Sequence, residues 1–258
     1  MSKISRRIFV GGMAAATTSL IHPFANASEL ISQIKFMTEE YPPFNYSANG
    51  ELRGIAADIM VEILKRTDTG LGRGDIEMLP WARGYNLTLK KKNHALFSTT
   101  LTDERRDLFK WVGPFAPTVV GLTARKDRKL TITDPSDMSK LRIGVVKDDV
   151  GHLLLIAAGV PASQLDVVLS NDLNYKKLIS GRIDAISYGA AVTKWGLKSM
   201  GENLADYEIV HELKRGSVYL ALNPQIPDSV VDKLQASFDG MVKDGTHQTI
   251  LARYLGQE

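Results

Sequence analysis

The chain has 258 residues, with 32 basic and 29 acidic side chains, five histidines and no cysteine. The lack of cysteine excludes disulfides, thiol catalysis, thiolate metal sites, iron–sulfur clusters and lipid attachment through cysteine. The formal net charge of +3 comes from residues 1–27, which hold three basic residues and no acid, so the rest of the chain is neutral and does not indicate nucleic acid or an anionic membrane as a partner.

The first 27 residues have the layout of a secretory signal peptide. Lys3, Arg6 and Arg7 precede an uncharged stretch over residues 8–20, and Ala25-Asn26-Ala27 fits the small-residue pattern of a cleavage site. The adjacent arginines favour a signal of the twin-arginine type, and the general secretory route is the alternative. We expect cleavage near Ala27 and a soluble periplasmic protein; a membrane anchor or a disordered tail are the other interpretations.

Strands and helices alternate over the next part of the chain. Ile55, Ile59 and Ile63 recur at helical spacing and predict an amphipathic helix over residues 55–66. Thr102 has the character of an N-cap residue, because two acids follow it in the first turn of another helix. The other elements predicted here are strands over residues 33–38, 75–79 and 95–99 and a helix over residues 85–92.

A second alternating series lies between two runs predicted to be extended, a run rich in β-branched residues at 118–123 and a further β run at 217–222. Such alternation favours mostly parallel sheets that are covered by helices on both faces. The two runs bracket the series, so they are candidates for strands that join one lobe to another. The series is predicted to contain strands over residues 141–146, 165–169, 183–187 and 207–213 and helices over residues 151–158, 173–180 and 192–200. Two further helices are predicted near the C-terminus, separated by a turn at Asp244-Gly245.

Sequence motifs of catalysis and metal binding are missing. The histidines do not have the spacing of a zinc site, and the chain lacks a phosphate-binding loop, a dinucleotide-binding fingerprint and a nucleophile elbow. Its carboxylates cannot be paired into a catalytic dyad from the sequence alone. We therefore expect no catalytic residue, no metal and no cofactor.

The segment after the first strand carries aromatic residues in a proline-rich turn, Tyr41-Pro42-Pro43-Phe44. In open α/β sheets, ligands bind beyond the carboxyl ends of the strands. Tyr41 and Phe44 are therefore predicted to form an apolar wall of a binding site. The alternative is that these aromatics plug the core, as aromatic residues often do.

A second segment combines hydroxyl side chains with an arginine. Ser98, Thr99 and Thr100 end a predicted strand, and a helix that contains Arg105 in its first turn begins at once. Hydroxyls, free backbone N–H groups and an arginine that can bind bidentately make a good receptor for a carboxylate. The alternative is an ordinary strand–cap–helix junction with a surface arginine.

Together these segments resemble the extracellular solute-binding proteins of family 3, the receptors of polar amino acid ABC transporters. The resemblance spans nearly the whole chain after the predicted signal. It rests on the order of several short motifs: E-Y-P-P-F from Glu40, G-x-L-x-G-I-x-x-D from Gly50, P-W-x-R from Pro80, T-x-x-R from Thr102, F-K-W-V-G-P from Phe109 and G-R-I-D-A from Gly181.

The resemblance implies an α/β protein of the two-lobed type II periplasmic-binding-protein fold. Each lobe is expected to be a mostly parallel sheet flanked by helices, and two crossover strands are expected to join the lobes. Lobe 1 would comprise residues 28–120 and 216–258, and lobe 2 residues 121–215. A ligand would bind in the cleft between the lobes, which close over it by a hinge motion.

By motif match, Arg105 would bind the α-carboxylate of the ligand. Hydroxyl residues beside it and aromatic residues from the first lobe would complete the site. The remaining expected ligand-binding residues are Glu40, Tyr41, Phe44, Trp81, Arg83, Ser98, Thr99, Thr100, Asp149 and Tyr188.

One position departs from the family pattern. Many members carry an acid shortly after the G-R-I-D-A motif that holds the ligand's α-ammonium group, and here that place falls at about Gly189. An ammonium without a partner is costly in a closed cleft, so Asp149 or Glu40 is the candidate replacement. The alternative is a ligand without an α-ammonium group.

The resemblance implies a receptor that captures an amino acid or a related small carboxylate, delivers it to an inner-membrane ABC permease and acts as a monomer. A module that reports its ligand to a membrane signalling partner would look the same in sequence. A small dehydratase-like enzyme is the third possibility, since fold alone does not fix function.

Overall fold

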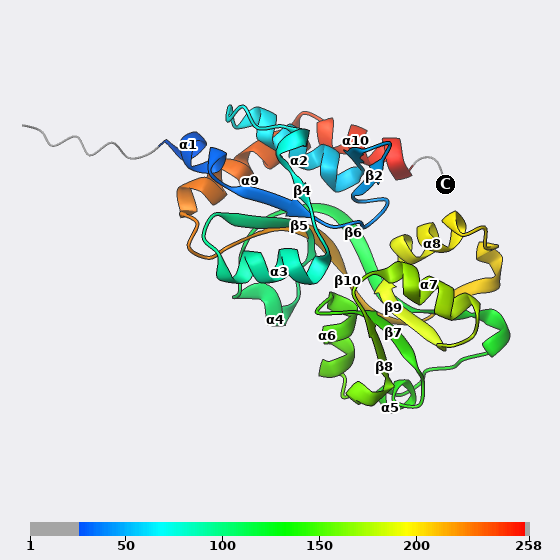
Figure 1. The fold of residues 1–258 in the computed structure, drawn as a ribbon. Helices are drawn as coiled ribbons and strands as arrows, with labels where there is room; N and C mark the ends of the chain where they lie inside the picture. The colour runs from blue at the N-terminus through cyan, green and yellow to red at the C-terminus, as the bar shows by residue number, and fades with distance from the viewer. Residues whose placement is uncertain (1–25, 256–258) are drawn as a thin grey trace, which may run out of the picture.

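A computed structural model describes residues 26–255 of the chain (Figure 1). The predicted signal peptide lies outside the described residues except for its last two positions. Of these, Asn26 accepts a hydrogen bond from the backbone N–H of Ser28 and thereby caps helix α1 (Ala27–Ser32). The expected cleavage site near Ala27 therefore coincides with the start of the first described helix, which the sequence pattern did not predict.

Two long strands form the centre of the molecule. Strands β6 (Lys110–Arg125) and β10 (Tyr207–Leu222) pair antiparallel along their whole length, in an eight-stranded sheet of order β4-β1-β5-β10-β6-β9-β7-β8. Strand β5 pairs with β10 only between Val218 and Leu222, whereas β9 pairs with β6 only between Val120 and Ala124. The long strands therefore join two smaller sheets at opposite ends, as expected for crossover strands.

The first lobe is built on the parallel strands β4, β1 and β5. A small antiparallel hairpin, β2–β3, lies beside them and was not predicted from the sequence. Helices α9 (Asp228–Lys243) and α10 (Thr246–Leu255) return to this lobe and pack against α1 and α2 (Figure 1). The other elements are β1 (Lys35–Thr38), β2 (Tyr46–Ala48), β3 (Glu51–Arg53), α2 (Ile55–Arg66), β4 (Glu77–Met78), α3 (Trp81–Lys90), β5 (His94–Thr100) and α4 (Asp103–Arg106).

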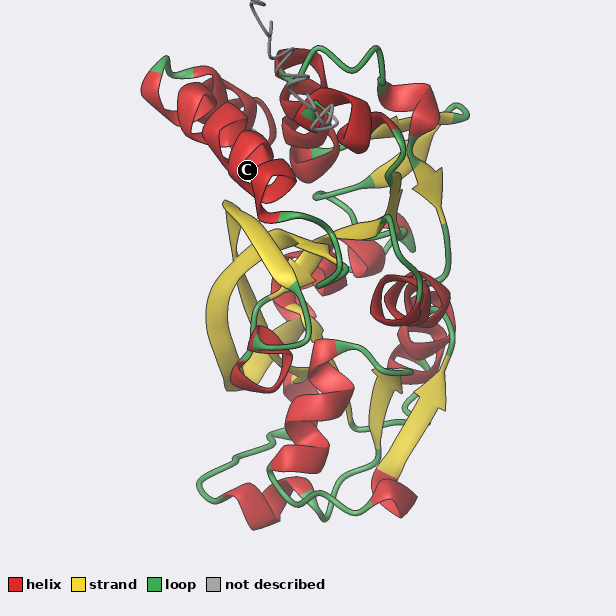
Figure 2. Cartoon of the chain, turned by 90° about the vertical axis from the view of Figure 1, so that its left-hand side faces the viewer, coloured by secondary structure: helices red, strands yellow, loops and turns green. Residues whose placement is uncertain are grey.

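The second lobe is built on the parallel strands β9, β7 and β8. In a view turned by 90°, helices lie at both ends of the molecule and also in its middle, beside the strands (Figure 2). The elements of this lobe are α5 (Pro135–Met138), β7 (Ile143–Val146), α6 (Val150–Ala157), β8 (Leu165–Val168), α7 (Asn171–Ile179), β9 (Ala185–Gly189) and α8 (Ala190–Ser199).

The predicted core periodicity is confirmed in α2, whose bounds are those expected from the sequence. Ile55, Ile59 and Ile63 are each fully buried, because residues four apart lie on one helical face. In the second lobe, Ile143 and Val145 of β7 pack with Leu155 of α6 in a separate apolar cluster. The fold is therefore the expected two-lobed α/β architecture, with mostly parallel sheets flanked by helices.

Two predicted elements differ from the observed ones in an informative way. The strands predicted over residues 207–213 and 217–222 form the single strand β10, because hydrogen bonds to β6 continue through the residues between them. Helix α3 begins at Trp81, four residues before the predicted start, with Pro80 as the residue before its first turn. Trp81 and Arg83 are therefore helical residues.

Candidate functional site

The turn after β1 is held rigidly between its two ends. Tyr41 and Asn45 form an isolated antiparallel bridge, and the Asn45 side chain donates to the carbonyl of Glu39 at 2.6 Å. The carbonyl of Phe44 accepts from the N–H of Ala56 at 2.8 Å, at the start of α2. Gly54 permits this close approach, because it has φ +121° and an added Cβ would lie 2.4 Å from the Phe44 carbonyl oxygen.

The hydroxyl residues at the end of β5 are all buried, and they are used in different ways. Ser98 has φ +61° and donates from its hydroxyl to the side-chain oxygen of Asn45. Thr99 donates to the carbonyl of Leu96 at 3.0 Å, which leaves it a structural role within the strand. Thr102 accepts from the N–H of Arg105 at 3.3 Å and so caps α4, as predicted.

Arg105 lies at the centre of the interface between the lobes. Its side chain is 1% exposed and lies against the rings of Trp81 and Tyr85, which stack on each other, with Cζ 5.2 Å and 5.0 Å from their centroids. Nη2 donates to the carbonyl of Asp148 across the lobes at 3.0 Å, and Nη1 donates to the carbonyl of Thr100 at 3.4 Å. Nε has no hydrogen-bond partner among the described residues, so the guanidinium has donors to offer.

Two buried carboxyl groups lie close to this arginine. Glu39 is 6% exposed and Asp149 is 3% exposed. Burial raises the pKa of Glu39 well above its usual value, and nearby Asp149 raises it further, while Arg105 and a hydrogen bond with Tyr188 oppose the shift. Burial also raises the pKa of Asp149 above its usual value, against the opposing effect of Arg105. Two buried carboxyl groups thus lie within electrostatic range of one buried guanidinium group.

Aromatic side chains also lie beside the cluster of Arg105, Glu39 and Asp149. Tyr41 stacks on Phe44 with ring centroids 5.5 Å apart, and it meets the edge of Tyr188 at 5.1 Å. All three side chains are nearly fully buried. Gly189 follows Tyr188 at the end of β9, and a Cβ added to it would lie 2.2 Å from the hydroxyl oxygen of Tyr41. An acidic side chain at position 189 therefore has no room in this arrangement.

A pocket of 370 Å³ opens beside the buried group, between the lobes. Glu39 and Trp81 line it from the first lobe, and Asn171 and Tyr188 line it from the second. Its size is in the range of small-molecule sites, roughly 300–1,000 Å³. The pocket lies beyond the carboxyl ends of strands from both lobes, where an α/β sheet places its ligands.

Of the predicted site residues, Glu40, Trp81 and Tyr188 line this pocket. The others in the region are buried and do not line it: Tyr41, Phe44, Ser98, Thr99, Thr100, Arg105 and Asp149. Glu40 lies at the edge of the pocket, where it is exposed and accepts from the N–H of Ser47 at 3.1 Å. Arg83 is exposed on α3 and is not among the residues that line this pocket.

The sequence analysis did not identify Glu39 or Tyr85. Glu39 adjoins the motif that begins at Glu40, and β1 buries consecutive residues, so no alternation indicated which of the two acids turns inward. Tyr85 lies one turn after Trp81 on α3, which places both rings on one helical face. Recognising that α3 starts at Pro80-Trp81 would have predicted this pair.

Within residues 26–255, no group of three or more His, Asp or Glu side chains is arranged to hold a metal ion. Over the same residues, no helix combines the length and the apolar character that a membrane crossing requires.

Comparisons with known proteins agree with this architecture. The family model of the bacterial extracellular solute-binding proteins, family 3, matches residues 34–257. The chain is 23% identical over 223 residues to the probable amino-acid-binding protein YxeM of Bacillus subtilis (strain 168), covering 84% of this chain and 81% of that protein.

Solved structures show the same fold. One is the substrate-binding protein of an ABC uptake transporter from Streptococcus pneumoniae with bound histidine, which has a TM-score of 0.75 and 17% identity and covers 88% of this chain and 94% of that one. Another is a histidine kinase sensor domain with similarity to periplasmic binding proteins, with a TM-score of 0.73, 15% identity and coverage of 87% and 96%.

Proposed function

Since the chain belongs to the bacterial extracellular solute-binding proteins of family 3, a family of binding proteins and not of enzymes, we propose that it is a periplasmic receptor for an amino acid. The receptor captures its ligand between the two lobes and delivers it, as a monomer, to an inner-membrane ABC permease. The observation that carries this proposal is the buried Arg105, whose guanidinium lies against the ring of the pocket residue Trp81 and whose Nε has no hydrogen-bond partner among the described residues.

Arg105 binds the α-carboxylate of the ligand in this proposal. A guanidinium donates two parallel hydrogen bonds to a carboxylate, and this geometry gives both strength and orientation. In the described arrangement Nη2 donates to the Asp148 carbonyl, which belongs to the other lobe. A ligand carboxylate would take over this donor when the lobes separate and close again around it.

The charges of the site favour a ligand with a net positive charge. Glu39 and Asp149 carry two negative charges when ionised, against the single positive charge of Arg105. A zwitterion adds no net charge, so one buried acid stays protonated, as the raised pKa of Glu39 favours, and contributes no attraction to the ligand. A basic amino acid supplies both an α-ammonium group for one acid and a side-chain cation for the other.

Calorimetric titration with L-arginine and with L-citrulline, its neutral isostere, tests this assignment. We expect arginine to bind at least about tenfold more tightly, since each charge-assisted hydrogen bond contributes about 1.5–3 kcal/mol. Glu39→Gln should remove the preference. Equal affinity for both ligands would contradict the proposed preference for a positively charged ligand, but it would still be consistent with an amino acid receptor.

The role of Arg105 is tested by comparing its alanine variant with the alanine variant of the next residue, Arg106. Arg105→Ala should weaken arginine binding by at least about a hundredfold, whereas Arg106→Ala should change it less than about twofold. Arg106 is a matched control because it is exposed and its one ion pair within residues 26–255 is with Asp103 on its own helix. Unchanged binding in Arg105→Ala would overturn the proposed carboxylate site.

The proposed lobe boundaries are residues 28–120 with 216–258 for lobe 1 and residues 121–215 for lobe 2. The pairing of β5 and β9 with opposite ends of the long strands supports this division.

Export is proposed to use the twin-arginine signal in residues 1–27. Replacing Arg6 and Arg7 by lysine should retain the protein in the cytoplasm on cell fractionation, and unaffected export would favour the general secretory route.

A second candidate function is ligand sensing. It is favoured by the similarity to a histidine kinase sensor domain, 96% of whose chain is covered. Ligand capture would be the same, and the closed lobes would contact a signalling protein instead of a permease. Deleting the gene separates the two functions: loss of ligand uptake supports transport, and loss of a ligand-dependent transcriptional response with intact uptake supports sensing.

A further inference from the structure

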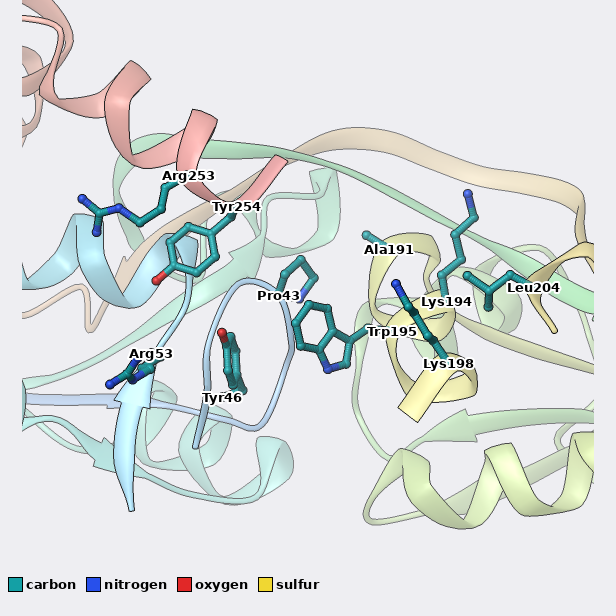
Figure 3. A pocket seen from close by; sticks show the side chains of 10 residues that line it. All are labelled: Pro43, Tyr46, Arg53, Ala191, Lys194, Trp195, Lys198, Leu204, Arg253 and Tyr254. Carbon is teal, nitrogen blue, oxygen red and sulfur yellow. The ribbon is translucent and has the colours of Figure 1, made fainter. Parts of the chain in front are cut away.

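A larger cavity lies elsewhere between the lobes (Figure 3). It has a volume of 670 Å³, against 370 Å³ for the pocket of the candidate site. Pro43 and Tyr46 line it from the first lobe and Trp195 of α8 lines it from the second, whereas Glu39, Arg105 and Asp149 do not line it. The cavity is thus separate from the proposed amino acid site, and its walls come from both lobes.

Every charged residue that lines this cavity is basic: Arg53, Lys194, Lys198 and Arg253. Arg53 pairs with Glu51, and Arg253 pairs with Asp58. Lys194 and Lys198 form no ion pair with another described residue. They lie one helical turn apart on α8, where like charges repel, so an anion bound between them would be stabilised by both.

Aromatic rings border the same cavity. Tyr46 and Trp195 approach each other from opposite lobes, with ring centroids 5.4 Å apart and planes 40° apart. The indole of Trp195 stays 43% exposed, which is unusual for so large an apolar side chain. Tyr254 of α10 lines the cavity together with this pair (Figure 3). Rings of this kind offer flat apolar contact surface to a planar ligand.

We propose that this cavity is a second ligand site, which binds a small organic dianion with a flat apolar body, such as an aromatic dicarboxylate. Lys194 and Lys198 neutralise the acidic groups of the ligand, and the rings of Tyr46 and Trp195 contact its body. Because both lobes contribute walls, the bound dianion stabilises the present arrangement of the lobes. The residues that hold the dianion are distinct from those proposed for the site at Arg105.

Calorimetric titration of the purified protein with isophthalate, a planar aromatic dicarboxylate, tests the proposal. We expect one binding event per chain that weakens as salt is added, because the contacts are ionic and partly exposed. The double variant Lys194→Glu/Lys198→Glu should weaken binding at least about tenfold. The matched control Lys90→Glu/Lys91→Glu changes the net charge equally at two exposed lysines, the last residue of α3 and the residue after it, and should bind within about twofold of the unchanged protein.

Amino acid binding by the double variant serves as the check that it is folded. Three results overturn the proposal: no binding of isophthalate to the unchanged protein, an equal loss in the control variant, or a loss in Arg105→Ala with normal binding in the α8 variant. The last result would place the dianion at the carboxylate site. Binding of an acidic peptide but not of isophthalate would identify a protein contact, and it overturns the proposal as well.

Discussion

The hydroxyl of Tyr41 occupies the space that a side chain at position 189 would need, since a Cβ on Gly189 would lie 2.2 Å from the hydroxyl oxygen and 3.0 Å from ring carbon Cζ. Tyr41 belongs to the first lobe and Gly189 to the second. The contact therefore limits how closely the lobes approach. It also gives a steric reason for the missing acid at the end of β9: Glu39 and Asp149 provide the buried carboxyl groups instead.

Gly189→Ala is predicted to hold the lobes further apart. The added methyl group meets Tyr41, and the overlap is relieved most easily by separation of the lobes, since overpacking a fixed contact costs about 1–3 kcal/mol. Small-angle X-ray scattering should show a larger radius of gyration for the ligand-free protein, and arginine should bind more weakly. The double variant with Tyr41→Phe should recover part of the affinity, because the nearest atom is removed.

Gly74→Ala is the control for this experiment. Gly74 lies in a short 3₁₀ helix, and an added Cβ there meets nothing within 4 Å. Identical scattering and affinity for Gly189→Ala and the control would show that the lobes do not depend on this contact.

The buried acid Glu39 predicts a pH dependence of stability. The groups that act on its pKa are Asp149, Arg105, Tyr188 and Glu40, and the net effect with burial is a raised pKa. Between the ordinary and the raised value the folded protein binds more protons than the unfolded chain. The contribution of Glu39 to the free energy of unfolding of the ligand-free protein should therefore be largest below the ordinary pKa of a glutamate and fall as the pH rises through the raised value.

Urea unfolding at a series of pH values measures this effect, and Glu39→Gln should flatten the decline. Arginine affinity should change in the opposite direction and rise with pH, because the ionised form of Glu39 is the one that attracts a cation. Glu77→Gln, at an exposed position of β4, serves as the control. An unchanged pH profile in Glu39→Gln would contradict the assigned role of this carboxyl group.

Trp81 donates a hydrogen bond between the lobes, and a substitution can remove this donor while an aromatic ring is kept. Its indole N–H donates to the Asp148 carbonyl at 2.9 Å, beside Arg105. Trp81→Phe keeps an aromatic ring against the guanidinium but removes the donor, which should lower ligand affinity about fivefold, or about 1 kcal/mol. Trp111→Phe is the matched control, because that indole donates at the same distance to the Arg106 carbonyl within the first lobe. An equal loss in both variants would show that the bond between the lobes has no special role.

Much of the fold follows from local patterns, and most of what the sequence missed depends on tertiary contacts. Helix α2 was predicted with its observed bounds, because three isoleucines recur at helical spacing and mark one buried face. The joining of two predicted strands into β10 depends on its partner β6, which no local pattern reveals. The site shows the same division. Arg105 was proposed as a ligand-binding residue from the hydroxyl strand and the helix cap, which are local features, whereas the buried position of Glu39 involves a tertiary contact, the hydrogen bond from the Asn45 side chain to its carbonyl.

The C-terminal helix is predicted to depend on one carboxylate of α2. Asp58 accepts hydrogen bonds from Arg73 at 2.8 Å, from Arg253 at 3.0 Å and from the Tyr254 hydroxyl at 2.8 Å. Its side chain is only 11% exposed. Asp58→Asn removes the charge that organises all three donors and should lower the free energy of unfolding by about 1–3 kcal/mol in urea denaturation.

Asp239→Asn is the control, because Asp239 accepts a single hydrogen bond from Gln235 on its own helix and is exposed. We expect a change of less than about 0.5 kcal/mol for this variant. The Asp58 variant should also lower the pKa of Tyr254, which burial and the neighbouring carboxylate raise to about 12. Because Arg253 and Tyr254 line the second cavity, loosening of α10 should weaken isophthalate binding while leaving the site at Arg105 intact. Equal unfolding energies for the two variants would contradict the assigned role of Asp58 in holding α10.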